Sequence, residues 1–208
     1  AGEIGGIARA LQADPARDVF LGEEASESRV KSMDLSDRKV IAFATHGLIP
    51  GDLDGLEQPA LALSEPPSDV EGEDGLLTME EILRLRMNAD WVVLSACNTG
   101  AGDGAGSEAV SGLGRAFFYA GTRALLVSMW PVESRSAGKL TTGVFRCQQG
   151  DKTLSRARAL RKVMLDLIDR QVVRDESSGR TVASYAHPFF WAPFVVVGDG
   201  GQGGRRGG

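Results

Sequence analysis

The chain has 208 residues, of which 42% are hydrophobic and 25% charged, a composition typical of a globular protein with a sizeable core. A net charge of −5 gives no electrostatic footprint for direct binding of nucleic acid or of an anionic membrane. No apolar run approaches the length of a bilayer span, and the N-terminus lacks the basic and apolar regions of a signal peptide. Two distant cysteines make no disulfide framework, so we expect a reducing, cytoplasmic setting.

The first part of the chain predicts one helix, two strands and a long excursion. Apolar residues recur at helical spacing near the N-terminus, at Ile4, Ile7, Ala8 and Leu11. Asp18–Leu21 is a weak strand candidate, whereas Val40–Ala44 is a continuous apolar run typical of a strand buried on both faces. The acidic, proline-containing stretch Pro50–Gly75 is predicted to leave the domain as a long loop, with Ala60–Leu63 as a short strand inside it.

The rest of the chain alternates helices and strands. Thr78 and Glu81 have the spacing of a capping box, which predicts the start of a helix. A separate helix is predicted further along, with one apolar face at Val110, Leu113, Phe117 and Ala120, and Gly121 can end it. Apolar runs predict strands at Trp91–Leu94, Ala124–Val127 and Phe194–Val197. Two more helices are predicted from the spacing of Ala137, Leu140 and Val144 and of Leu154, Ala157, Leu160, Met164 and Leu167. This alternation implies an α/β fold, a three-layer sandwich whose mostly parallel sheet has helices on both faces.

The residues that follow the strands carry the candidate chemistry, because ligands in open α/β sheets lie beyond the carboxyl ends of the strands. His46 follows one predicted strand and Cys97 follows another. If the strands are neighbours, His46 can take the thiol proton and pass it to a leaving amine while the thiolate of Cys97 attacks a carbonyl. The backbone N–H groups of Gly47 and Cys97 would hold the oxyanion. Either side chain alone is more often structural, and the pairing favours catalysis.

Five sequence motifs resemble the CHAT domain, a family of caspase- and separase-like cysteine peptidases common in bacteria and often fused to TPR repeats. They are FATHG at 43–47, LSACNTG at 94–100, GLGRAF at 112–117, SMWPV at 128–132 and HPFFWAPF at 187–194. The resemblance implies a caspase-like sheet, a protein or peptide substrate, and His46 and Cys97 as the catalytic dyad. It also implies that a TPR or other regulatory region, of this chain or of a partner, acts on the domain.

The resemblance runs from about Ile4 to Gly198. We therefore expect one peptidase domain over residues 1–198, lacking an N-terminal strand of a complete domain of this type. Residues 199–208 are rich in glycine and poor in apolar side chains, so we expect them to form a flexible tail.

The segment after the Ala124–Val127 strand is the predicted substrate-binding region. In caspase and separase relatives the segment at this place pairs with the substrate backbone, as in β-augmentation. The alternative is that Trp130 only covers the core. The predicted substrate contacts are Ser128, Met129, Trp130, Val132, Glu133 and Asp103. An inward-facing carboxylate of Glu133 or Asp103 would need a cation, which favours cleavage after Lys or Arg over cleavage after Asp; solvated surface carboxylates are the other interpretation.

Other functions remain as alternatives. The domain can be a binding or scaffold module of a bacterial signalling or defence system whose dyad is idle or activated by a partner. A nucleotide-binding, Rossmann-like domain is a weaker alternative, because the glycine loop at 100–106 lacks the third glycine of the dinucleotide pattern and the Lys of a P-loop. We expect no metal or cofactor, since the two His and two Cys lack ligand spacing. Cys147 and His187 are interpreted as structural.

Overall fold

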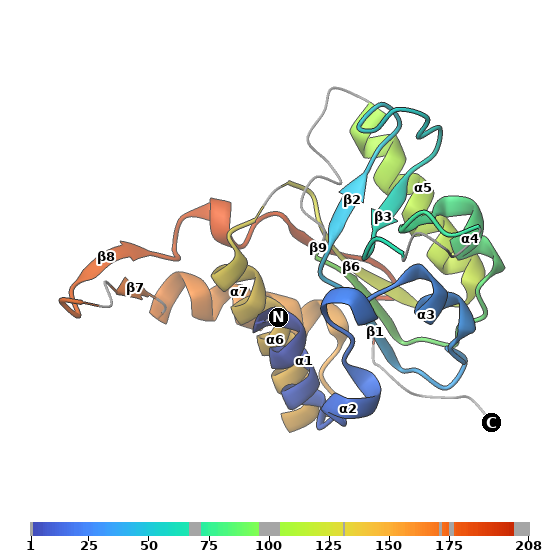
Figure 1. The fold of residues 1–208 in the computed structure, drawn as a ribbon. Coiled ribbons are helices and arrows are strands. Elements are labelled where there is room, and N and C mark those ends of the chain that lie inside the picture. The colour runs from blue at the N-terminus through green and yellow to red at the C-terminus, as the bar shows by residue number, and fades with distance from the viewer. Residues whose placement is uncertain are drawn as a thin grey trace.

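A central four-stranded sheet organises the molecule (Figure 1). The structure is a computed structural model that describes residues 2–66, 72–95, 105–130, 132–170, 172–174 and 177–201. The strand order in the central sheet is β1-β5-β6-β9. The strands are β1 (Val40–Phe43), β5 (Trp91–Leu94), β6 (Ala124–Ser128) and β9 (Phe194–Gly198). The first three are parallel and β9 is antiparallel to β6, so the predicted mostly parallel α/β sheet is confirmed.

Helices cover both faces of this sheet, as the sequence predicts. One layer holds α1 (Gly2–Leu11), α6 (Ser134–Gly150) and α7 (Arg156–Arg170), and the other holds α3 (Glu27–Ser32), α4 (Met79–Arg84) and α5 (Ala105–Ala120). Successive strand residues face opposite layers. Val92 packs with Phe117 of α5, whereas Val93 packs with Leu140 of α6. Each face of the sheet therefore has its own hydrophobic core.

Local sequence signals set the ends of two helices. The Thr78 hydroxyl accepts a hydrogen bond from the Glu81 backbone N–H, and the Glu81 carboxylate accepts one from the Thr78 N–H, so the capping box at the start of α4 is confirmed. At the end of α5, Gly121 has a φ of +112°. A residue with a side chain rarely adopts this φ, which explains why the helix ends at a glycine.

A second sheet of three strands lies beside the carboxyl end of β1. Its members are β2 (His46–Leu48), β3 (Ala60–Ala62) and β4 (Leu76–Thr78), all antiparallel. The Pro50–Gly75 stretch was predicted to leave the domain as a long loop, but part of it belongs to the hydrophobic core, because Ala60 and Leu61 are fully buried. The backbone N–H groups of Asp74 and Gly75 both donate to the buried carboxylate of Glu27, which fixes the end of the stretch on α3.

The prediction of a strand at Asp18–Leu21 is wrong. Asp14 caps a helical turn, α2 (Pro15–Asp18), and its backbone N–H donates to the Asp18 carboxylate. Asp18 is therefore part of a helix, and the remaining residues lead into a 3-10 turn, η1 (Gly22–Glu24), without pairing with a strand. A hairpin that was not predicted from the sequence follows α7. It consists of β7 (Val172–Arg174) and β8 (Thr181–Ser184) and extends away from the body of the molecule (Figure 1).

The buried side chain of Arg156 holds the start of α7 to the end of β9. Its Nη1 lies 3.0 Å from the Asp199 carboxylate, and its guanidinium carbon lies 5.5 Å from the centre of the Trp91 ring. Backbone N–H groups of Arg156 and Ala157 donate to the carbonyls of Gly201 and Gly200. The first residues of the predicted flexible tail therefore contact α7, while 202–208 lie outside the described residues. No helix within the described ranges is both long and apolar enough for a membrane span.

Candidate active site

Neighbouring parallel strands bring the two predicted catalytic segments to the same edge of the sheet. In the register of β1 and β5, Phe43 lies beside Leu94, and the Ser95 backbone N–H donates to the Phe43 carbonyl at 3.0 Å. His46 follows Phe43 by three residues, and Cys97 follows Leu94 by three. Adjacent strands lie about 4.8 Å apart. The neighbour relation that the sequence argument required is confirmed, whereas Cys97 itself lies outside the described residues.

His46 is held by the second sheet rather than by a loose loop. It is the first residue of β2 and lies opposite Ala62 of β3. The hydroxyl of Thr45 donates to the Ala62 carbonyl, which ties the turn between β1 and β2 to β3. The His46 side chain is exposed, so it is accessible to a substrate, while the next residue, Gly47, is buried opposite Leu61.

A cavity of about 1000 Å³ lies beside His46 on the α1–α6 face of the sheet. Its lining includes Ser95 at the end of β5 and Val132 after β6. Helices α1, α6 and α7 supply the remaining walls, through residues such as Glu3, Gly138 and Asp166. The cavity thus joins the carboxyl ends of β1 and β5 to the residues that follow β6, which is where the sequence analysis expected a ligand.

The predicted substrate-binding segment extends β6. The Met129 N–H donates to the Pro193 carbonyl at 2.9 Å, which continues the β6–β9 ladder past Ser128. Because peptide groups alternate in direction along a strand, those of Ser128 and Trp130 face away from β9, toward the β5 side. Ser128 is fully buried, whereas Trp130 is 37% exposed. None of these three residues is part of the cavity lining, so the structure brings only Val132 of the segment to the cavity.

Comparison with known families bears on this geometry. The family model for the CHAT domain matches residues 1–199, nearly the whole chain. The chain belongs to the CHAT domain family. This is a caspase-like peptidase family, and the suspected resemblance is confirmed. No curated protein matches the sequence.

Glu133 has a structural role in this CHAT domain that the sequence analysis missed. It is the N-cap of α6, and its carboxylate accepts hydrogen bonds from the backbone N–H groups of Arg135 and Ser136 at 2.9 and 2.7 Å. A carboxylate at this position also stabilises the positive end of the helix dipole. The second carboxylate suggested for a substrate cation, Asp103, lies outside the described residues.

Glu3 is a cavity residue that the sequence analysis did not consider. Its Oε1 is buried and has no hydrogen-bond partner in the described part of the chain. Burial raises the pKa of the Glu3 carboxyl, and hydrogen bonds from the side chains of Thr141 and Ser95, together with the nearby N-terminal charge, partly oppose this shift. Helical periodicity predicts the α1 helix itself, but no local signal indicates that its first turn reaches the end of β5.

The remaining His and Cys of the CHAT domain occupy structural positions, as interpreted from the sequence. His187 caps the 3-10 turn η2 (Pro188–Phe190), and its Nδ1 accepts a hydrogen bond from the Phe189 N–H at 3.2 Å. Cys147 is half-buried on α6 and packs against the core of that face. Within the described ranges, no three His, Cys, Asp or Glu side chains gather closely enough to hold a metal ion.

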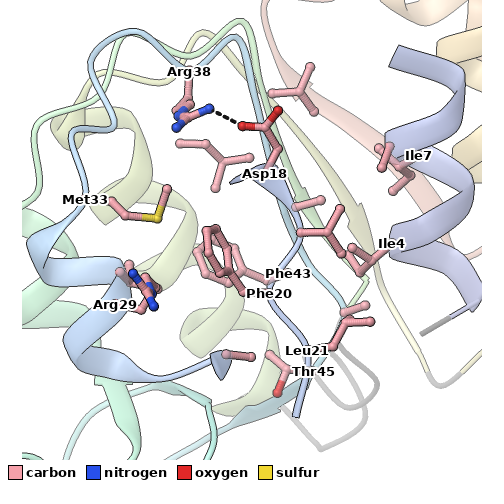
Figure 2. Close-up of a pocket in the computed structure, with 18 of the residues that line it drawn as sticks. Ile4, Ile7, Asp18, Phe20, Leu21, Arg29, Met33, Arg38, Phe43 and Thr45 are labelled. Carbon is pink, nitrogen blue, oxygen red and sulfur yellow. Dashed lines mark hydrogen bonds and ion pairs between the residues drawn. The ribbon is translucent and has the colours of Figure 1, made fainter. Parts of the chain in front are cut away.

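A second cavity of about 830 Å³ lies along β1, an edge strand of the sheet in the described part of the chain (Figure 2). Apolar side chains dominate its walls, including Ile4, Ile7, Phe20, Met33 and Phe43. An ion pair between Arg38 and Asp18, at 2.5 Å, closes one end. The sequence predicted that β1 is buried on both faces, but its first three residues are only half-buried, because this cavity lies against the strand.

Proposed function

We propose that the protein is a cysteine endopeptidase that cleaves a protein substrate, or itself, with Cys97 as nucleophile and His46 as general base. The observation that carries this proposal is the register of β1 and β5, since Phe43 and Leu94 are neighbours and each candidate follows its strand by three residues. Membership of a caspase-like peptidase family supports it. The cavity beside His46 supplies room for a substrate side chain.

The chemistry follows from the roles of the two side chains. His46 accepts the thiol proton, and the thiolate of Cys97 attacks the peptide carbonyl carbon. Backbone N–H groups of Gly47 and Cys97 stabilise the oxyanion of the tetrahedral intermediate. His46 then donates its proton to the leaving amine, the C–N bond breaks, and an acyl-enzyme remains. Water, deprotonated by His46, releases the carboxylic acid and regenerates the thiol.

An extended substrate would lie along the β5 side of the segment, beside the half-exposed Trp130. The peptide group of Trp130 points to that side, because the N–H of the preceding residue, Met129, is bonded to the Pro193 carbonyl on the opposite side. Main-chain hydrogen bonds of this kind give affinity with little sequence preference. Specificity would then come from the pockets that flank the strand.

Labelling with iodoacetamide near neutral pH tests the dyad. We expect Cys97 to react at least about tenfold faster than Cys147, because a general base within reach raises the thiolate fraction of its thiol. A His46→Ala variant is expected to lose this advantage. Mass spectrometry of tryptic peptides measures both rates in the same sample, and His187→Ala is the matched control that should leave them unchanged.

Equal labelling of the two cysteines, or fast labelling of Cys97 that persists in His46→Ala, would count against an activated thiolate. Either result would favour the alternative of a binding or scaffold module.

Activity is expected to be independent of metal ions. Thiolate attack needs no Lewis acid, and the two His and two Cys of the sequence lack ligand spacing. The acidic stretch Pro50–Gly75 is where a hard cation such as calcium would bind if one were used. The labelling rate of Cys97, measured with a chelator and again after addition of calcium or zinc, should stay constant. A rate that disappears with chelator and returns with calcium would refute this expectation.

A further inference from the structure

Helices α1, α6 and α7 lie side by side in one layer (Figure 1), and the cavity beside His46 extends between them as a groove. The floor of the groove is α6, where Gly138 and Gly143 have no side chains that would fill the space. A Cβ added to Gly138 would lie 3.7 Å from the Glu3 Cα of α1. A Cβ added to Gly143 would lie 2.8 Å from Cγ1 of Val163 on α7. Helices α1 and α7 therefore form the two walls.

Three basic residues of α6 face this groove. They are Arg135, Lys139 and Arg146, and each is exposed and lines the groove. Since an α-helix turns by about 100° per residue, their directions fall within about 40° of one another, between the sides that contact α1 and α7. We call these three residues the basic stripe. With a rise of about 1.5 Å per residue, the stripe is about 16 Å long.

The α1 wall places a further cation, Arg9, beside the basic stripe. Gly6 of α1 is in close contact with α6, because an added Cβ would lie 2.4 Å from the Thr142 hydroxyl oxygen. The two helices run in the same direction, since the contacts of Glu3 and Gly6 advance together along α6. One helical turn further on, Arg9 of α1 and Arg146 of α6 stand at the same level.

The α7 wall brings Lys162 to this level as well. Helices α6 and α7 are joined by the short connection 151–155 and run antiparallel. Lys162 adjoins Val163, which contacts Gly143 one turn before Arg146. Side chains on a helix lean toward its N-terminus, and for α7 this is the direction of Arg146. Three helices therefore direct cations toward one part of the groove.

Basic residues outnumber acidic ones in the groove, although the chain as a whole has a net charge of −5. The acidic residues among its described lining are Glu3 and Asp166, against the basic stripe, Arg9 and Lys162. The Glu3 carboxyl receives hydrogen bonds from Thr141 and Ser95, and the Asp166 carboxylate forms an ion pair within α7. The groove is therefore cationic on an acidic protein.

The cations that meet near the end of α6 are not neutralised by neighbouring acids. Within the described ranges, Arg9, Arg146 and Lys162 form no ion pair. The charge of Lys162 reaches Asp151, but that carboxylate accepts hydrogen bonds from the Thr153 hydroxyl and N–H at 2.6 and 2.9 Å. Packed helices lie about 8–10 Å apart, within the Debye length of about 10 Å at 0.1 M salt, so the three cations repel one another. A bound anion would relieve this repulsion.

We propose that this groove binds an extended acidic segment of a partner protein, with its carboxylates directed at the basic stripe, Arg9 and Lys162. The stripe is as long as about five residues of extended chain. Arg binds a carboxylate through two parallel hydrogen bonds, and such charge-assisted bonds are roughly twice as strong as neutral ones. The inference goes beyond the proposed peptidase function and needs no activity of the dyad, although a segment bound here would end beside His46.

An acidic peptide suits the groove better than a nucleic acid or a polyphosphate does. The lining includes apolar side chains, among them Val132 and Val163, which can pack against residues that alternate with the carboxylates. A phosphate polymer has a charge on every unit and continues beyond the groove, where the net negative charge of the chain repels it.

Fluorescence anisotropy of the full chain tests this binding. The probe is a fluorescein-labelled peptide of about ten residues in which Glu alternates with Ala, and we expect it to bind at least about tenfold more tightly than the same peptide with Gln in place of Glu. The preference should weaken as salt is raised. The triple variant Arg9→Glu, Arg146→Glu, Lys162→Glu should lose it. The matched control reverses three exposed arginines that do not line the groove and should keep it: Arg17→Glu, Arg158→Glu, Arg161→Glu.

NMR titration with the Glu peptide locates the site without any substitution. We expect the backbone amides of Gly6, Gly138 and Gly143 to shift. Shifts confined to residues outside the three helices would overturn the proposal, as would equal binding of the Glu and Gln peptides or a preference that survives the triple variant. Tighter binding of a single-stranded oligonucleotide or a polyphosphate of matched length would assign the groove to a phosphate polymer and reject the acidic peptide.

Discussion

Replacement of Cys97 with alanine is expected to abolish peptide-bond cleavage while the protein stays folded. Alanine has no nucleophile, so no acyl-enzyme can form, and loss of one sulfur atom removes little packing. His46→Ala keeps the thiol but loses the general base, and we expect its activity to fall by roughly 10²–10⁴-fold. A search of a proteome for new N-termini after incubation with active and substituted protein measures the loss and also finds the substrate.

The matched control for this substitution is Cys147→Ala. Cys147 lines the same cavity but is half-buried on α6 and packs against the core, so its loss should leave cleavage nearly unchanged. Loss of activity in Cys147→Ala with full activity in Cys97→Ala would show that the nucleophile has been assigned to the wrong residue. Circular dichroism of each variant separates loss of chemistry from loss of fold.

The elements with strong local patterns could be predicted from the sequence. Continuous apolar runs identified β1, β5, β6 and β9, and the helix of Thr78 was found because a capping box is a local signal. The short strands β2 and β4 were missed, since three residues are too few for a period of two to be recognised. Those strands form only because β3 lies between them, which is a tertiary effect.

The residues of the candidate site also differ in whether they could be identified from the sequence. His46 and Cys97 could be singled out because each follows a strand, and strand order is constrained by general rules of α/β topology. Glu3 and Glu133 could not be assigned from the sequence. The contact of α1 with the end of β5 depends on the close approach of Gly6 to Thr142, and the capping role of Glu133 depends on where α6 begins.

The glycine that ends α5 is the position where a side chain would be least tolerated. An added Cβ on Gly121 would lie 2.1 Å from the Met87 carbonyl oxygen and 2.9 Å from its carbonyl carbon. Both atoms belong to the backbone, and the Met87 N–H also donates to the Ala120 carbonyl at 2.6 Å, so neither side can move without breaking this contact. Met87 is buried in the core that α5 shares with β5, which links the turn to the centre of the fold.

We therefore expect Gly121→Ala to lower the free energy of unfolding by at least about 3 kcal/mol, the sum of an unfavourable φ and a backbone clash. Gly55→Ala is the matched control, because Gly55 also has a positive φ, +82°, but its added Cβ would meet no atom within 4 Å. That variant should lose only about 1 kcal/mol, the strain of the left-handed conformation alone. Urea denaturation followed by tryptophan fluorescence measures both values. Similar losses in the two variants would mean that the turn at Met87 yields to the new methyl group, and that contact with the α5 terminus does not hold the segment before β5 in place.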